Sequence, residues 1–276
     1  MTAPIAITGA SGNVGQAVIA ALRARGVAVR PLLREPVGDA AAFDFLRPDT
    51  FEAAVSGAAG LFLLRPPPIS AVGPTLNRLV DVALAGGVSR VVFLSVIGAD
   101  TRGYIPHAKV EKHLAGGAAA WTFLRAGFFA QNLGDAYRAD IREHDEIFVP
   151  AGDGRAAFVD VRDLGEVAAR AFSEDGHAGR AYRLTGPEAL SFAQVAELLS
   201  GALGRKIRYT RPGVLRYMRR LRQRGLPFAQ RLVQAVLHVG LRFGQGEGLD
   251  PTLAQLLGRP PRTLASYIHD HLDLWR

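Results

Sequence analysis

The chain has 276 residues, of which 49% are hydrophobic and 21% are charged, so it can bury a sizeable globular core. It has no cysteine, which excludes disulfide bonds and thiolate metal sites, and no run of about 18 apolar residues that could span a membrane. Its net charge of +8 favours an anionic ligand or partner, such as a phosphate-bearing cofactor, a nucleic acid or an acidic protein.

The first predicted element is a buried strand at residues 5–7, which ends in a glycine-rich turn. Gly9, Gly12 and Gly15 follow the strand, and a helical pattern begins at Val14. A strand, a G-x-x-G-x-x-G turn and a helix in this order are typical of dinucleotide-binding proteins, in which backbone amides at the helix start face the pyrophosphate. Because no charged segment followed by an apolar stretch precedes this pattern, we expect a cytoplasmic protein without a signal peptide.

A second strand is predicted at residues 27–33, and Arg34 closes it. In a dinucleotide-binding fold, the residue at this position meets the adenosine ribose. An arginine there accommodates the 2′-phosphate of NADP, whereas an acidic residue binds the 2′-hydroxyl of NAD. Glu35 would occupy the position after a shift of one residue. We favour NADP(H) over NAD(H).

The chain then alternates predicted strands and helices. Strands are expected at residues 60–64, 91–94 and 121–124, helices at 51–55 and 76–85, and a loop followed by a helix over 104–114. This alternation is typical of an α/β fold with a doubly wound parallel sheet, the Rossmann arrangement. From about residue 140 the pattern changes to short strands, at 147–149, 157–161 and 181–184, with helices at 163–172 and 192–203. We therefore predict a Rossmann domain over residues 1–150, on which the helix near 163–172 packs back, and a smaller C-terminal α/β lobe over 151–276.

Residues 205–224 carry nine basic residues. Leu215, Met218 and Leu221 recur among them at helical spacing, which predicts a basic amphipathic helix. One interpretation is a helix docked on the lobe with its arginines in solvent. The other is a contact surface at Arg216–Arg224 for a protein, a nucleic acid or a membrane surface. The chain has no zinc-ligand spacing and no regular interleaving of aromatic residues with these arginines, which argues against nucleic acid.

Several segments together resemble a known family. The turn Thr8–Gly15, T-G-A-S-G-N-V-G, is similar to that of atypical short-chain dehydrogenase/reductases. A further set of features is similar to the NmrA-like subgroup: Arg34 and the segments 92–95, 121–132, 158–163 and 257–263. This subgroup is close to the quinone oxidoreductase and ergot-alkaloid-type reductase branches.

The resemblance implies an NAD(P)-binding site and places residues along the cofactor. The residues it implies are Gly9, Ser11, Gly12, Asn13, Val14 and Gly15 for the pyrophosphate, Arg34 for the 2′-phosphate, Asp44 and Phe45 for the adenine, Leu64, Arg65 and Pro66 for the ribose, and Ala126, Gly127 and Phe128 for the nicotinamide end. The family commonly has proline where this chain has Ala126, which makes that loop less constrained.

The chain lacks the catalytic pair of the wider superfamily. Typical members of the wider superfamily use Tyr-x-x-x-Lys, whose spacing puts both side chains on one helix face so that the lysine lowers the tyrosine pKa. In this chain Tyr104 and Lys109 are five residues apart and Pro106 lies between them. His107 is the candidate catalytic residue, because its ordinary pKa of about 6.5 would let it donate a proton after hydride transfer. Alternatively, His107 pairs with Glu111, four residues further along the helix.

The substrate candidates suit a planar and largely apolar small molecule. They are Ser95, Phe128, Phe129, Gln131 and Asn132, with Tyr137 beside them. A nicotinamide can reduce a good electrophile without strong acid assistance. The first hypothesis is therefore an NAD(P)H-dependent oxidoreductase that reduces a quinone, imine or enone.

The alternative hypothesis is a non-catalytic, NAD(P)-binding redox sensor that acts through a protein partner. It is motivated by the missing tyrosine–lysine pair and by the Arg216–Arg224 helix. A non-redox catalyst on the same scaffold is a third possibility. None of these requires a metal site, and we predict none.

Overall fold

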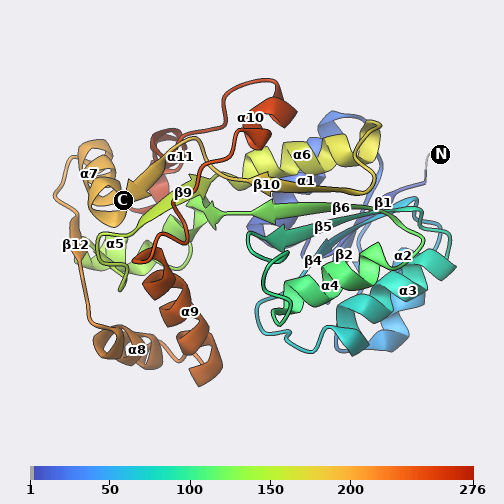
Figure 1. Cartoon of the computed structure of the whole chain (residues 1–276), viewed down its shortest axis with the longest axis horizontal. Coiled ribbons are helices and arrows are strands. Elements are labelled where there is room, and N and C mark those ends of the chain that lie inside the picture. Colours follow the sequence, from blue (N-terminus) through green and yellow to red (C-terminus); the bar gives the residue numbers. More distant parts are fainter. Residues whose placement is uncertain (1–2) are drawn as a thin grey trace. The chain divides into compact units, whose positions relative to one another are not determined.

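The computed structural model describes residues 3–276, which divide into two compact units (Figure 1). The first unit runs to Ala126 and resumes over Val161–Leu184, and the second comprises Gly127–Asp160 and Thr185–Arg276. The chain therefore passes between the units three times. The boundary expected from the sequence, between residues 150 and 151, instead lies inside the second unit. The reason is that the helix and strand within Val161–Leu184 complete the sheet layer of the first unit.

The first unit is built on a seven-stranded parallel sheet. In spatial order the strands are β10 (Arg180–Leu184), β6 (Ala120–Ala126), β5 (Arg90–Val96), β4 (Gly60–Leu64), β1 (Ile5–Ile7), β2 (Val29–Leu33) and β3 (Ala41–Ala42). The strand order reverses between β1 and β4, whose residues Ile7 and Phe62 lie opposite each other. This is the predicted doubly wound Rossmann arrangement, in which ligands bind beyond the carboxyl ends of the strands at the reversal point.

Helices cover both faces of this sheet (Figure 1). Two lie on one face, α1 (Asn13–Ala24) and α6 (Val161–Ser173), and three lie on the other, α2 (Phe51–Val55), α3 (Arg78–Ala85) and α4 (Pro106–Ala115). Helix α6 approaches α1 closely at Gly165, where an added Cβ would lie 2.6 Å from the carbonyl carbon of Ala17. A glycine is required at this crossing because any side chain would separate the two helices.

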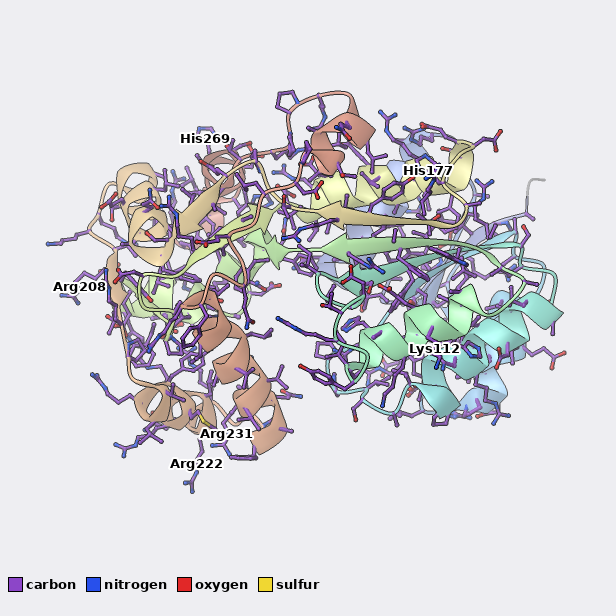
Figure 2. The ribbon with its side chains drawn as sticks, in the orientation of Figure 1. Lys112, His177, Arg208, Arg222, Arg231 and His269 are labelled. Carbon is purple, nitrogen blue, oxygen red and sulfur yellow. The ribbon has the colours of Figure 1, made fainter. Side chains whose placement is uncertain are left out.

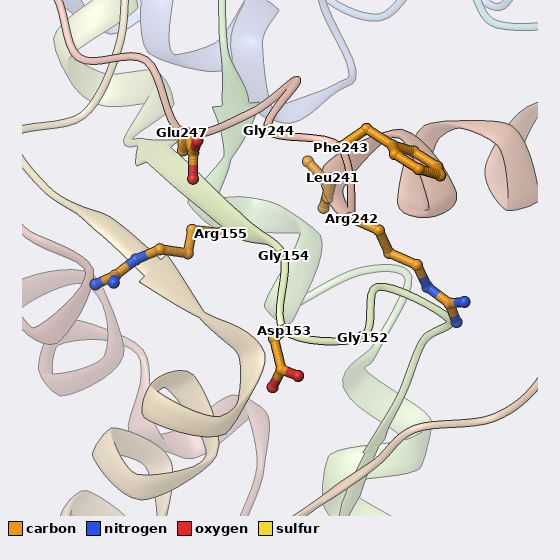
Figure 3. Close-up of a pocket in the computed structure, with 9 residues that line it drawn as sticks. All are labelled: Gly152, Asp153, Gly154, Arg155, Leu241, Arg242, Phe243, Gly244 and Glu247. Carbon is orange, nitrogen blue, oxygen red and sulfur yellow. The ribbon is translucent and has the colours of Figure 1, made fainter.

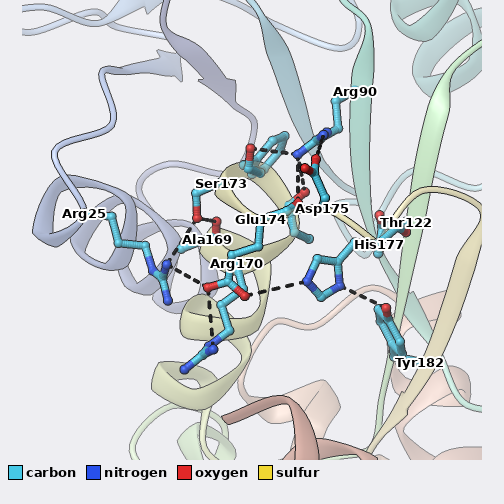
Figure 4. A network of polar contacts seen from close by, with 12 residues as sticks. Arg25, Arg90, Thr122, Ala169, Arg170, Ser173, Glu174, Asp175, His177 and Tyr182 are labelled. Atoms are coloured by element: carbon cyan, nitrogen blue, oxygen red, sulfur yellow. Dashed lines mark hydrogen bonds and ion pairs between the residues drawn. The ribbon is translucent and has the colours of Figure 1, made fainter. Parts of the chain in front are cut away.

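A polar network fastens the end of α6 to the amino-terminal edge of the sheet (Figure 4). Arg90, the first residue of β5, donates to the carbonyl oxygens of Ala171, Phe172 and Glu174 at 3.1, 2.9 and 3.3 Å. The last carbonyls of a helix have no partner within the helix, and a cation stabilises that negative end. The Glu174 carboxylate also pairs with Arg25 at 3.0 Å. This network therefore stabilises the edge of the sheet opposite the expected ligand site.

The second unit has two small sheets and its own core. One sheet contains β11 (Ala189–Ser191), β9 (Arg155–Val159) and β7 (Phe128–Phe129), and the other pairs β12 (Arg208–Thr210) with β8 (Glu146–Phe148). Its helices are α5 (Arg138–His144), α7 (Phe192–Leu203), α8 (Val214–Gln223), α9 (Phe228–Leu241), α10 (Thr252–Leu257) and α11 (Leu264–Asp270). The side chain and backbone of Ser191 exchange hydrogen bonds with Gln194 in a capping box, so α7 begins where the sequence predicts.

The basic segment forms α8, but its buried face differs from the prediction. Leu215, expected on the apolar face, is 84% exposed, and the fully buried positions are Tyr217 and Leu221. Tyr217 can be buried because its hydroxyl donates a hydrogen bond to Gln234 of α9 at 3.0 Å while its ring packs in the core. Within residues 3–276, the structure contains no helix long and apolar enough to cross a membrane.

Candidate cofactor and active site

Thr8 joins the carboxyl ends of the two central strands of the first unit. Its hydroxyl donates to the carbonyl oxygen of Phe62 at 3.0 Å and accepts the Leu64 amide hydrogen at 2.8 Å. The Thr8 amide donates to the same Phe62 oxygen at 3.0 Å. This buried threonine therefore sets the position at which the chain leaves β1, which the glycine pattern alone does not predict.

The glycine turn has the geometry of a phosphate-binding loop. Gly9 has φ +64°, a conformation that glycine adopts without strain, and Gly15 packs so closely that an added Cβ would collide with the Gly9 carbonyl oxygen. Gly12 is different, because a Cβ there would come no closer than 3.5 Å to that oxygen. Its outer side is therefore open to a ligand.

The start of α1 is suited to bind an anion. Ser11, Gly12 and Asn13 are exposed, and Val14 is the first buried residue of α1. Gly12 is the N-cap, and no side chain caps the helix there. First-turn amides have no acceptor within a helix, and the positive end of the helix dipole favours a negative ligand. The residues present therefore fit a pyrophosphate.

The residues expected at the adenosine end differ in their accessibility. Arg34 is exposed directly after β2, and within residues 3–276 the structure records no ion pair for its guanidinium. The Asp44 carboxylate accepts the Leu46 amide hydrogen at 2.9 Å, and the Phe45 ring is buried against Phe43. Phe45 is thus a core residue whose ring faces the interior, and only Arg34 offers an unengaged side chain.

The end of β4 contributes a half-buried arginine. Leu64 packs on Gly9, and Arg65 donates from one guanidinium nitrogen to the carbonyl oxygens of Pro66, Pro67 and Ile69 at 3.1, 3.1 and 2.6 Å. Its Nε also lies 3.3 Å from Nε2 of His107, near the start of α4. The proline-rich loop is therefore held by Arg65 beside the glycine turn.

The alternative interpretation, in which His107 pairs with Glu111, is wrong. Glu111, on α4, instead accepts two hydrogen bonds from Arg125 of β6, at 3.1 and 2.7 Å. Burial, and then the nearby Arg65 charge, lower the pKa of His107 to about 4. At neutral pH His107 is therefore uncharged, which corrects the expectation of an ordinary pKa and a protonated acid.

Ser95 lies inside β5, not at its exit. It is completely buried, and its hydroxyl donates to Glu111 at 2.5 Å. In this position Ser95 supports the Glu111–Arg125 pair, and its hydroxyl is not available to a substrate.

The segment expected at the nicotinamide end crosses from the first unit into the second. Ala126 is the last residue of β6 and is buried, and Gly127 begins the second unit. Phe128 and Phe129 are half-buried in β7, with the Phe128 ring edge-on to Phe158 at 5.3 Å.

The two amides after β7 have different surroundings. Gln131 is buried and donates to the Asp160 carboxylate at 3.0 Å. Its amide group therefore contributes to the packing of the second unit. Asn132 is half-buried, and its carbonyl oxygen accepts the Tyr137 amide hydrogen.

A buried tyrosine–histidine pair in the second unit is absent from the sequence prediction. The Tyr137 hydroxyl lies 2.5 Å from Nε2 of His238 on α9, and Nδ1 of His238 lies 2.6 Å from the Gln234 carbonyl oxygen. A carbonyl only accepts, so Nδ1 carries the proton and Nε2 accepts from Tyr137. Tyr137 was expected beside the substrate candidates, but its pairing with His238 was not predicted, because the two residues are 101 positions apart.

A hollow of about 720 Å³ lies wholly in the second unit, between the Gly152–Gly154 turn and the end of α9 (Figure 3). Its charged groups have other partners: Asp153 pairs with Arg211 at 2.8 Å, and Arg242 donates to the Pro150 carbonyl at 2.7 Å. Figure 3 shows Arg155 and Arg242 pointing away from each other. They do not converge on one anion. None of the predicted site residues lines this hollow, and residues 3–276 contain no cluster of three metal-ligating side chains.

The arginines of the Arg216–Arg224 segment are divided between two roles. Arg220 and Arg224 pair with the buried carboxylate of Asp140, at 2.9 and 2.5 Å, and so attach α8 to the second unit. Arg219 and Arg222 are exposed, and Figure 2 shows the Arg222 side chain extending away from α8.

Comparison with known proteins agrees with this geometry. A model of the NmrA-like family matches residues 1–267. The NAD(P)H azoreductase of Xenophilus azovorans is 30% identical over 280 residues, which cover 97% of each chain. The structure of an NADPH-dependent quinone oxidoreductase from Escherichia coli, complexed with NADPH, has a TM-score of 0.85 at 28% identity, over 98% of this chain and 99% of that one. The negative transcriptional regulator NmrA has a TM-score of 0.75 at 18% identity over 99% of this chain and 97% of that one, a likeness in fold alone.

Proposed function

The chain belongs to the NmrA-like family, and from that premise we propose that it is an NAD(P)H-dependent oxidoreductase that reduces a planar, apolar acceptor. The observation that carries the proposal is the open glycine turn at the point where the strand order reverses, with uncapped amides at the start of α1. When bound, the reduced nicotinamide supplies a hydride, so that the acceptor gains the hydride and one proton and the cofactor is left oxidised.

NADP(H) is the proposed cofactor, in preference to NAD(H). Arg34 supports this choice because it is exposed at the end of β2 and has no ion pair within residues 3–276. A guanidinium can bind a phosphate through two parallel hydrogen bonds. The adjacent Glu35 would repel that phosphate, so the preference depends on which side chain faces the ribose.

A quinone, imine or enone is the proposed class of acceptor. Such electrophiles need little acid assistance, which suits a chain in which Tyr104 and Lys109 do not have the usual spacing and His107 is uncharged at neutral pH. Phe128 and Phe129 offer aromatic surface for a planar molecule. The azoreductase and the quinone oxidoreductase to which the chain is similar are named for an azo and a quinone acceptor, both conjugated, which also supports this class.

The test is direct. Purified full-length protein is mixed with NADPH and, separately, with a quinone, a cyclic imine, an enone and an azo compound, and the loss of the reduced-nicotinamide absorbance is followed. We expect turnover with at least one conjugated acceptor. Binding of NADPH without turnover on any member of the panel would contradict the proposed function.

A redox sensor that acts through a protein partner is the second candidate. It rests on Arg219 and Arg222, which project into solvent from α8. Replacing both with glutamine should abolish capture of the partner without disturbing the helix, because Arg220 and Arg224 still hold it. Identical captured proteins with and without these two arginines would exclude this role.

A further inference from the structure

Arg65 is an unusual residue at the end of a Rossmann strand because its guanidinium faces inward. It is half-buried, and three backbone carbonyl oxygens of the loop from Pro66 to Ile69 accept hydrogen bonds from it. Within residues 3–276 the structure records no carboxylate paired with it. Its Nε–H is directed at Nε2 of His107, 3.3 Å away.

This contact determines where His107 carries its proton. Arginine can only donate, so Nε2 of His107 must accept, and the single proton of the neutral ring must be on Nδ1. The ring is further held by Phe93 of β5, with ring centroids 6.0 Å apart. Within residues 3–276 the structure records no hydrogen bond for Nδ1. His107 therefore presents an N–H without a partner at the carboxyl edge of the sheet.

We propose that Arg65 is a positioning residue that holds His107 as the neutral tautomer with its proton on Nδ1, so that this N–H donates a hydrogen bond to the acceptor during reduction. This inference rests on the proposed function. Negative charge develops on the acceptor oxygen or nitrogen as the hydride arrives, and a fixed N–H stabilises that charge without transferring its own proton. The proton that completes the reduction is then taken from solvent water. Arg65 thereby acts through His107, in addition to the ribose contact that the family resemblance implies.

The charges around His107 agree with a neutral donor. Arg65 faces it from the end of β4, and the β5 neighbour, Phe93, is uncharged. On α4 itself, Glu111 is occupied by Arg125 and Ser95, and residues 3–276 place no other carboxylate in a recorded contact with His107 or Arg65. Because the pKa of His107 is about 4, activity that depended on a protonated ring would fall as the pH rises through about 4, whereas activity that depends on the neutral donor would be retained above that pH.

The experiment replaces Arg65 and observes both the histidine ring and the reaction. NMR of nitrogen-15 histidine-labelled protein reports the tautomer and titration of each ring, and His107→Gln identifies the His107 signals. For the parent protein we expect a neutral Nδ1–H ring at neutral pH. Arg65→Met should shift the ring toward the Nε2–H form and raise its midpoint, and should lower kcat about 10- to 100-fold. Arg65→Lys, which retains a donor, should restore part of both.

Two controls separate this role from general effects. Arg23→Met removes an exposed arginine of the first unit, whose partner is the exposed Asp39, and should change neither the ring signals nor kcat. The dissociation constant for NADPH, measured on each variant, separates loss of kcat from loss of cofactor binding.

The outcomes distinguish this inference from the proposed function. The positioning role is overturned, even if the enzyme is active, by an Nε2–H ring in the parent protein. It is also overturned if Arg65→Met leaves either the His107 ring or kcat unchanged. An inactive parent with the expected Nδ1–H ring overturns the proposed function, and with it the acceptor contact. The expected ring together with a matching loss of kcat supports both.

Discussion

Acidification should destabilise the second unit through His238. This histidine is only 4% exposed, and both ring nitrogens are hydrogen-bonded in the neutral form, to Tyr137 and to the Gln234 carbonyl. Burial lowers its pKa from 6.5 to about 4, because an imidazolium in apolar surroundings loses its hydration.

The direction and size of the effect follow from linkage. Between pH 6.5 and about 4 the unfolded chain binds a proton at His238 that the folded chain does not bind. The folded-state pKa is the lower one, so the stability is fully present above pH 6.5 and is lost as the pH falls toward 4. At 1.36 kcal/mol for each pH unit, the loss is about 3 kcal/mol.

The assay isolates the second unit and this one residue. In a Trp121→Phe background, Trp275 is the only remaining tryptophan, and it is completely buried in the second unit. Urea unfolding followed by its fluorescence gives the free energy of unfolding at each pH. His238→Gln keeps an acceptor for Tyr137 but does not titrate. The parent should therefore lose about 3 kcal/mol more than this variant between neutral pH and about pH 4.

A matched control strengthens the comparison. His269 is exposed on α11, and His269→Gln should retain the pH dependence of the parent. If the parent and His238→Gln lose stability equally on acidification, then His238 is not a buried neutral histidine and the reasoning is refuted.

Three further predictions concern the first unit. Arg34→Ala should weaken NADPH binding at least about tenfold and NADH binding little, by calorimetric titration, and equal losses would mean that the 2′-phosphate is bound elsewhere. Gly15→Ala should lower the melting temperature, because its Cβ collides with the Gly9 carbonyl. Gly12→Ala should melt at the same temperature as the parent but bind NADPH more weakly. Equal melting temperatures for the two variants would contradict this packing. Glu111→Gln should reduce the free energy of unfolding by about 3 kcal/mol, because it leaves the half-buried Arg125 without its main partner. Asp100→Asn removes a half-exposed partner of the same arginine and should cost less than about 1 kcal/mol. Similar urea midpoints for the two variants would refute this difference.

Local features were predictable because neighbouring residues determine them. The strand at residues 60–64 matches β4, and the helix at 192–203 matches α7 with its Ser191 cap. The alternation of strands and helices and the glycine turn follow from the same kind of signal: an apolar run of strand length, a turn residue, and then helical spacing. The position of Arg34 at the end of β2 is likewise a matter of counting along the chain.

Pairing between distant residues was not predictable. His107 and Glu111 have the spacing of an ion pair, yet Glu111 is paired with Arg125 and His107 contacts Arg65, 42 residues away. The Tyr137–His238 bond spans 101 residues. In each case several partners were chemically suitable.

The sequence by itself determined a parallel α/β sheet, the phosphate-binding turn at Gly9–Gly15 and a basic amphipathic helix. Packing of the helix near residues 163–172 on the Rossmann domain was predicted, but only the tertiary structure decided that β10 completes the sheet of the first unit. Only the tertiary structure decided, too, that Ser95 is buried and bonded to Glu111 and that His107 is neutral beside Arg65. The physical reason is that backbone conformation responds to residues close in sequence. The protonation and availability of a side chain respond instead to whichever groups the fold brings within a few ångströms, and to how much water it leaves around them.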